Sequence, residues 1–207
     1  MKYTQLRLDC ELAKKGRLYR VILAKSDIKL DELGAYLVFI FEGTMEHYFL
    51  YHTKTICYEA PDWIEDHLLF PTNIVNKDYT KHTLKDLPDV FTFEYDTGEG
   101  WTFKCKKQKK SVEKISKKKV IVLEGAGMGI FEDNRQTFEA YIKGKLKKTF
   151  KKSQEELEDD EEYYLPWNLD MKQLGDFDKP LDIDYINDGL EEQVQDFISD
   201  QLLFGMY

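Results

Sequence analysis

Residues 91–105 read FTFEYDTGEGWTFKC, with large apolar side chains at every second position on both sides of a short turn. A five-residue loop at 96–100 would place three couples of these side chains opposite one another: Phe91 with Cys105, Phe93 with Phe103 and Tyr95 with Trp101. Side chains alternate between the two faces of a strand, so all six share one face. The stretch therefore predicts an antiparallel hairpin whose aromatic face packs on a core.

The segments before the hairpin predict more strands and one helix. Residues 2–12 and 17–24 alternate polar and apolar side chains and predict two strands joined by a turn. In residues 27–42 the apolar side chains recur at the spacing of one helical face, with Asp27 as the expected N-cap. This helix is expected to pack across the sheet.

Between the helix and the hairpin, residues 47–59 have the composition of a strand. Residues 61–81 predict a long irregular connection, because Pro61 and Pro71 interrupt any regular pattern. Residues 83–87 predict a single helical turn that ends before the next proline.

The chain after the hairpin reads as a strand, a glycine-rich loop at 125–129 and a helix. The loop, GAGMG, matches neither the dinucleotide fingerprint nor the Walker sequence, so it does not indicate nucleotide binding. Asp133, with Gln136 three residues later, is typical of a capping box at the start of the helix.

The last quarter of the chain is strongly acidic. Residues 151–207 contain 4 basic and 17 acidic residues, whereas basic residues exceed acidic ones by 4 in residues 1–150. The acidic block at 155–162 follows two lysine clusters, at 104–119 and 143–152. Such clusters can bind phosphate backbones, but lysines also protect the edges of sheets from aggregation.

Residues 188–203 predict a C-terminal helix, with Asp188 as the expected N-cap. Its apolar stripe contains Leu190, Val194, Phe197 and Ile198. The stripe must pack either on the main domain or on a second copy of the chain, so a homo-oligomer through this helix is an open alternative.

Other features restrict the class of protein. The N-terminus lacks the apolar run of a secretory signal, and no stretch is long enough to cross a bilayer, so we expect a cytoplasmic protein with no membrane contact. The three cysteines are widely spaced, which indicates buried thiols rather than a disulfide framework. Neither the cysteines nor the four histidines have metal-ligand spacing, so spacing predicts no metal and no cofactor.

Several short sequence motifs, in the same order, resemble those of the plasmid pRiA4b ORF-3-like family, which is associated with transposons. LYRVIL at 18–23 resembles an Ile-Trp-Arg-Arg strand, with Tyr19 and Arg20 at its Trp and first Arg. LDELGAYL at 30–37 resembles a Leu-x-x-Leu-His helix in which Gly34 replaces the His. His47 falls where the family has a His before a strand.

The hairpin carries the clearest part of this resemblance. FTFEYDTGEGW resembles Phe-x-Tyr-x-Tyr-Asp-Phe-Gly-Asp-x-Trp: it keeps Tyr95, Asp96, Gly98 and Trp101, and Glu99 is a conservative acid.

The glycine-rich segment contains the last of the short motifs that resemble the family. LEGAGMGIFEDN at 123–134 is similar to Leu-Asp-Gly-x-x-Ala-Cys-Pro-Pro-Glu-Asp-Cys and keeps Glu132 and Asp133. Gly129 and Asn134 replace its two cysteines, which argues against thiol or metal chemistry that depends on them.

The motifs that resemble the family cover roughly residues 3–146. The resemblance implies an α+β fold, with a curved and mainly antiparallel mixed sheet packed against helices. We expect a domain at 1–150 and an acidic linker with a C-terminal helix at 151–207. The family has no established activity, and its link to mobile elements suggests protein or nucleic-acid contacts only by association.

Three functions remain open. The first is a non-enzymatic module that binds a protein or peptide. Its candidate surface comprises Tyr19, Arg20, His47, Tyr95, Asp96, Glu99, Trp101, Glu132 and Asp133.

The second is a nucleic-acid-binding protein that uses both lysine clusters and is inhibited by its own acidic tail. The third is a metal-dependent hydrolase or nuclease with four carboxylates as ligands: Asp96, Glu99, Glu132 and Asp133. Turns and helix caps use carboxylates too, so this third reading requires the two loops to converge.

Overall fold

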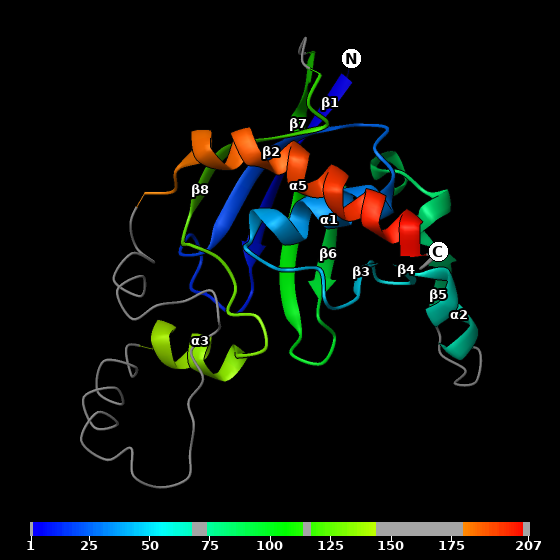
Figure 1. Ribbon diagram of the computed structural model, residues 1–207, viewed down its shortest axis with the longest axis horizontal. Helices are drawn as coiled ribbons and strands as arrows, with labels where there is room; N and C mark the ends of the chain where they lie inside the picture. The colour runs from blue at the N-terminus through cyan, green and yellow to red at the C-terminus, as the bar shows by residue number, and fades with distance from the viewer. Residues whose placement is uncertain (1, 68–73, 114–116, 144–179, 205–207) are drawn as a thin grey trace, which may run out of the picture.

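The computed structural model describes residues 2–67, 74–113, 117–143 and 180–204 (Figure 1). Eight strands form one sheet in the order β5-β4-β3-β6-β7-β1-β2-β8. Their bounds are β1 (Lys2–Cys10), β2 (Tyr19–Lys25), β3 (Phe49–His52), β4 (Ile56–Glu59), β5 (Val75–Asp78), β6 (Val90–Tyr95), β7 (Trp101–Glu113) and β8 (Val120–Ala126). The pairing is antiparallel throughout except between β4 and β5, which confirms a mixed, mainly antiparallel sheet in an α+β fold.

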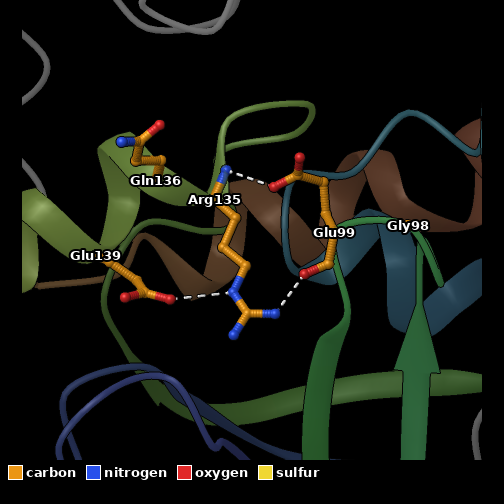
Figure 2. Close-up of a pocket in the computed structure, with 5 residues that line it drawn as sticks. All are labelled: Gly98, Glu99, Arg135, Gln136 and Glu139. Atoms are coloured by element: carbon orange, nitrogen blue, oxygen red, sulfur yellow. Dashed lines mark hydrogen bonds and ion pairs between the residues drawn. The ribbon is translucent and has the colours of Figure 1, made fainter.

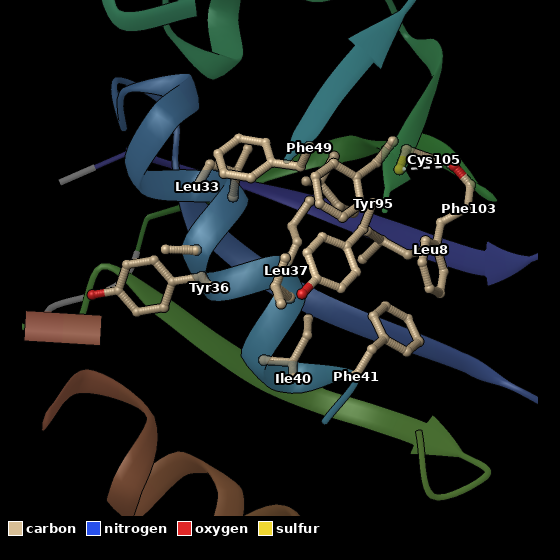
Figure 3. Packing of buried hydrophobic residues seen from close by; sticks show 14 of the residues in the cluster. Leu8, Leu33, Tyr36, Leu37, Ile40, Phe41, Phe49, Tyr95, Phe103 and Cys105 are labelled. Atoms are coloured by element: carbon tan, nitrogen blue, oxygen red, sulfur yellow. Dashed lines mark hydrogen bonds between the residues drawn. The ribbon is translucent and has the colours of Figure 1, made fainter. Parts of the chain in front are cut away.

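The aromatic hairpin forms with the predicted register. Strands β6 and β7 pair Phe91 with Cys105, Phe93 with Phe103 and Tyr95 with Trp101. All six side chains are buried, as Figure 3 shows for those it labels. The turn that joins the strands is thereby fixed at the end of two central strands.

Helix α1 (Leu30–Ile40) packs on the aromatic face of the sheet, as the periodicity predicted. The expected N-cap was wrong: the helix begins after Lys29, and an isolated bridge between Lys29 and Thr83 keeps the preceding chain extended. At Gly34 the backbone of α1 lies against the ring of Phe49, where a Cβ atom would come within 2.0 Å of a ring carbon.

The segment before the hairpin is more regular than predicted. Residues 47–59 form two strands rather than one, because the Thr53 hydroxyl accepts a hydrogen bond from the amide of Ile56 (2.9 Å) and closes a turn between them. The connection at 61–81 contains α2 (Pro61–His67), β5 and η1 (Tyr79–Lys81). A helical turn, η2 (Leu84–Asp86), follows as predicted.

Helix α3 (Arg135–Ile142) begins one residue later than the expected capping box. Asn134 is the N-cap, and its side chain accepts a hydrogen bond from the amide of Thr137 (3.1 Å). Asp133 instead adopts the left-handed conformation, with φ +57°, in the loop before the helix.

Helix α5 (Ile183–Phe204) contains the predicted C-terminal helix but starts earlier, so Asp188 lies inside it. The Asp182 carboxylate accepts a hydrogen bond from the amide of Tyr185 (3.0 Å) near its start. In Figure 1 the helix crosses beside α1 and reaches β8. Leu190 and Val194 are buried there, so this part of the stripe packs on the chain's own fold.

The amide side chain of Asn187 joins α5 to the backbone of β8. It accepts a hydrogen bond from the amide of Val122 and donates one to its carbonyl, both at 2.8 Å. The acidic block at 155–162, the lysines at 144–152 and the boundary at residue 150 lie outside the described residues. None of the described helices is long and apolar enough to span a membrane.

Candidate functional site

The turn of the hairpin and the start of α3 meet in space, although 35 residues of sequence separate Gly100 from Arg135. The backbone amide of Arg135 donates to the Glu99 carboxylate (2.8 Å), and its guanidinium donates to the Glu99 carbonyl (2.5 Å). The loop at 96–100 and the loop at 127–134 therefore converge, which is what a shared site requires.

An open depression lies where these two segments meet (Figure 2). Its volume is about 330 Å³, and it is lined by Gly98, Glu99, Arg135, Gln136 and Glu139. We call these five residues the turn–helix face. Figure 2 shows the Arg135 side chain reaching between Glu99 and Glu139.

The charged groups of the turn–helix face hold one another in place. The Arg135 Nε atom lies 3.1 Å from the Glu139 carboxylate, and the Lys143 ammonium lies 2.7 Å from it. These hydrogen bonds, first from Lys143 and then from Arg135, lower the pKa of Glu139. The Arg135 Nη2 atom has no hydrogen-bond partner among the described residues, so it can donate to a ligand.

His47 links the two loops a second time. It belongs to the segment at 41–48 that joins α1 to β3. Its Nε2 atom lies 2.8 Å from a carboxylate oxygen of Asp133, and its Nδ1 atom lies 3.8 Å from one of Asp96. One ligand atom from each of the three residues lies within 4.8 Å of the others. This His47 cluster (His47, Asp96 and Asp133) has donors that suit a cation or a polar group.

Asp96 is the buried member of the His47 cluster. It is 4% exposed, and φ +51° places it in the left-handed region, which Asp adopts more readily than most residues. One carboxylate oxygen accepts a hydrogen bond from the Glu99 amide (3.2 Å). The other, Oδ2, is buried and has no hydrogen-bond partner in the part of the chain that the structure describes.

Glu132 lies beside the His47 cluster but faces the core. It is 1% exposed, accepts a hydrogen bond from the amide of Thr44 (2.6 Å), and accepts a second from the Tyr95 hydroxyl. Burial, and then the hydrogen bond with Glu132, raise the pKa of Tyr95. The pair ties β6 to both flanking loops, so its role is to support the site.

Four carboxylates were predicted to share a metal, and in the structure they have different partners. Asp96 and Asp133 flank His47, whereas Glu99 binds Arg135 and Glu132 binds Tyr95. The hydrolase with all four carboxylates as ligands stays a prediction, and the hydrogen bonds that Glu99 and Glu132 already make argue against it.

Two other predicted surface residues are buried and cannot contact a partner. Arg20 is fully buried, and its guanidinium donates to four backbone carbonyls: those of Tyr19, Ile40, Ala126 and Met128. Burial lowers the pKa of Arg20 to about 10. Trp101 is also fully buried, with its ring edge-on to Phe138 at 4.9 Å.

Tyr19 belongs to a different part of the fold. Its hydroxyl donates to Glu124 (2.6 Å), and the Arg7 guanidinium lies over its ring at 4.0 Å. Glu124 and, less strongly, burial raise the pKa of Tyr19. These contacts involve β1, β2 and β8 rather than the two converging loops.

Sequence reasoning missed Arg135, Gln136 and Glu139 as site residues. The first two directly follow the Glu-Asp-Asn word at 132–134, and Glu139 lies one helical turn further on, which was the available signal. The role of His47 between two aspartates had no such signal, because its partners lie 49 and 86 residues away in sequence.

Comparisons with known proteins support the family resemblance. A model of the family described as plasmid pRiA4b ORF-3-like protein matches residues 2–178. The match extends past residue 146, where the short words end, and includes the acidic block at 155–162. No curated protein matches the chain.

Solved structures include one that is similar in fold. It is the crystal structure of a protein of unknown function from Methanosarcina mazei Go1, with a TM-score of 0.60 and 16% sequence identity. The similarity covers 82% of this chain and 97% of that one. At this identity the likeness supports the arrangement of helices and strands, and the site must be argued from the residues of this chain.

Proposed function

We propose that this chain, which belongs to the plasmid pRiA4b ORF-3-like protein family, is a non-enzymatic module that binds a protein or peptide. The binding surface in this proposal is the turn–helix face. No activity is established for the family or for its structural neighbour, so the proposal rests on the geometry of this chain.

The observation that supports it most strongly is an open polar depression whose side chains are already held in place. Glu99, Arg135 and Glu139 form a chain of hydrogen bonds across two elements, so a partner would meet a preorganised surface. Preorganisation favours affinity because less side-chain freedom is lost on binding. The depression is open rather than enclosed, which suits an extended peptide or a protein surface more than a small molecule.

The partner's chemistry follows from these groups. The Nη2 atom of Arg135 can donate to a carbonyl or carboxylate of the partner, and Gln136 is exposed and offers both a donor and an acceptor. The surface therefore suits main-chain and polar side-chain contacts of a peptide segment.

Photo-cross-linking tests the proposal. A photoreactive residue at Gln136 should trap a partner from cell extract, whereas the same residue at Gln193, an exposed glutamine of α5, should not trap it. Glu139→Gln, which removes only partly exposed ion pairs, should reduce the product several-fold without loss of fold. Equal products at both positions, or no product at Gln136, would contradict the proposal.

Nucleic-acid binding through the lysine clusters remains a separate proposal with less support. Three lysines of the 104–119 cluster are occupied within the fold: the Lys107 ammonium donates to the Leu84 carbonyl (2.8 Å), Lys118 to Asn187 (2.5 Å), and Lys119 pairs with Glu32. Burial lowers the pKa of Lys107. These contacts favour a structural role for that part of the cluster.

A full-length variant tests this alternative better than a truncation, because α5 packs on the sheet and its removal would expose the core. Replacing the acids of 155–162 with amides should produce salt-dependent binding of DNA or RNA if the tail inhibits the lysine clusters. Absence of binding at low salt would end this proposal.

A cytoplasmic location is part of the main proposal, and it is supported by three buried cysteines without disulfides.

A further inference from the structure

We infer that His47, Asp96 and Asp133 form a binding site for one divalent transition-metal ion. The inference goes beyond recognition of a protein partner and does not depend on it. The His47 cluster lies beside the turn–helix face but shares none of its five residues.

The first support is geometric. The three side chains come from three separate segments, at 41–48, 96–100 and 127–134, and they place one imidazole nitrogen and two carboxylate oxygens within 4.8 Å of one another. The 3.8 Å between Nδ1 of His47 and the Asp96 oxygen is too long for a hydrogen bond and suits two ligands about 2 Å from a shared ion.

The second support is the unpartnered oxygen of Asp96. A buried carboxylate normally uses both oxygens, because a desolvated charge without compensation is costly. Asp96 is 4% exposed, its Oδ2 atom lacks a partner among the described residues, and its other carboxylate oxygen, Oδ1, lies 3.8 Å from Nδ1 of His47. A cation at this point would compensate a charge that the protein groups leave incompletely satisfied.

The backbone around Asp96 holds the ligand in this position. Its amide donates to the Tyr48 carbonyl (2.9 Å), and its carbonyl accepts from the Gly100 amide (2.6 Å). The ring of His47 also packs edge-on to Tyr95, with centroids 6.0 Å apart. The two more buried ligands are thus placed by the fold before any ion arrives.

An ion could enter from solvent. The side chains of His47 and Asp133 are 32% and 58% exposed, so one side of the cluster is open to water. Three protein ligands would leave coordination positions for water molecules. One imidazole with two carboxylates favours Zn²⁺, Mn²⁺, Fe²⁺ or Co²⁺, because nitrogen ligands discriminate against Mg²⁺ and Ca²⁺.

The chain contains a matched comparison. His52 on β3 lies 2.7 Å from Glu94 on β6, and both side chains are partly exposed, but this pair has no second carboxylate in the described structure. It represents an ordinary histidine–carboxylate pair. If such a pair alone attracted metal, His52 would bind as well as His47.

Isothermal titration of the full-length chain with ZnCl₂, and Mn²⁺ electron paramagnetic resonance, test the site. We expect one ion per chain, with affinity reduced at least tenfold by His47→Gln or by Asp96→Asn, and unchanged by His52→Gln. Asp133→Asn is the third ligand variant and should also weaken binding at least tenfold. Asp133 is exposed and Asn also tolerates a positive φ, so the fold should persist. Circular dichroism checks the fold of each variant.

Unchanged affinity in the His47 and Asp133 variants, or no stoichiometric ion in the wild-type chain, would overturn the inference. Cross-linking through Gln136 with and without EDTA separates it from the proposed function. Loss of metal binding in His47→Gln with intact cross-linking would leave protein recognition standing, and the reverse result would leave the metal site standing.

Discussion

Gly34 lies within α1 with the Phe49 ring directly against its backbone. That ring is stacked on Tyr79 and tilted against Phe93, so it has little room to move. The family resemblance places a His at this position, and here the space that a side chain would occupy is filled by Phe49 instead. The replacement is therefore a packing feature of this chain.

Gly34→Ala should destabilise the protein by about 1–3 kcal/mol, because overpacking outweighs the gain in helix propensity. Gly189→Ala is the matched control: it is also a helical glycine, but its added Cβ meets nothing within 4 Å, so we expect a gain of up to about 1 kcal/mol. Urea unfolding measures both. A stabilising Gly34→Ala would contradict the packing described.

Arg20 belongs to a motif that resembles the family, but its role here is structural and not partner binding. Its guanidinium joins the end of α1 to β2 and to the chain around β8 through backbone carbonyls. The buried partners are carbonyls rather than a carboxylate, so the planar set of five donors is what the site needs.

Arg20→Lys should cost about 2–4 kcal/mol, because an ammonium cannot reach all four carbonyls and leaves buried acceptors unpaired. Arg7→Lys is the control. Arg7 pairs with Asp9 at 27% exposure, so its replacement should cost less than about 1 kcal/mol. Chemical denaturation gives both values, and equal costs would show that the Arg20 geometry is unimportant.

At the scale of elements, the sequence predicted what has strong periodicity. The hairpin, β1, β2, α1 and the C-terminal helix were all recognisable because their buried side chains alternate or recur every three to four residues. β5 was missed since its sequence, VNKD, has no alternation, and it is a strand only through parallel pairing with β4. The observed helices begin at other residues than predicted, because several Asp residues near each start could have served as the N-cap.

The site was predictable in part for the same reason. Its two loops were identified from motifs that resemble the family, but which carboxylates meet His47 and which face the core depends on the positive φ at Asp96 and Asp133 and on the burial of Glu132. Sequence spacing contains neither quantity.

Asp78 connects β5 to η1 and gives the element a pH dependence. Burial alone would raise the pKa of Asp78, but hydrogen bonds from Lys81 and Thr80 outweigh it and lower the pKa below 3.8. The native state then stays ionised at lower pH than the unfolded chain. The stabilisation is therefore complete above about pH 5 and declines as the pH falls through the folded-state pKa.

Asp78→Asn should lose up to about 1 kcal/mol near pH 7, and the difference from wild type should shrink as the pH falls from about 5 to 2. Urea unfolding at several pH values measures this difference. Asp27→Asn, at an exposed position, is the control for the substitution itself and should change the free energy of unfolding at pH 7 by less than about 0.5 kcal/mol. A difference that stays constant with pH would contradict the role of the carboxylate.

At the scale of the whole molecule, the C-terminal helix packs back on the fold that the earlier part of the chain forms. Helix α5 packs on α1 and on the edge strand β8, and Asn187 occupies backbone groups of β8 that an edge strand otherwise exposes. The division into a domain at 1–150 and an acidic linker with a C-terminal helix at 151–207 stays a prediction. A homo-oligomer through α5 also stays a prediction, and it would have to use a face of α5 other than Leu190 and Val194.

The same arrangement leaves the hairpin turn and α3 at one end of the central strands, with the candidate site between them (Figure 1). The central claim is that this end of the molecule, and not the lysine-rich strand β7, is the functional surface. The two readings assign binding to different backbone segments.

Amide hydrogen exchange of the full-length chain, with and without the partner captured through Gln136, tests this claim most directly. We expect the partner to slow exchange at residues 96–101 and 133–139 by at least about tenfold, with little change along 104–108 and 117–120. Slowed exchange confined to the lysine-rich segments, with the turn and α3 unchanged, would contradict the account.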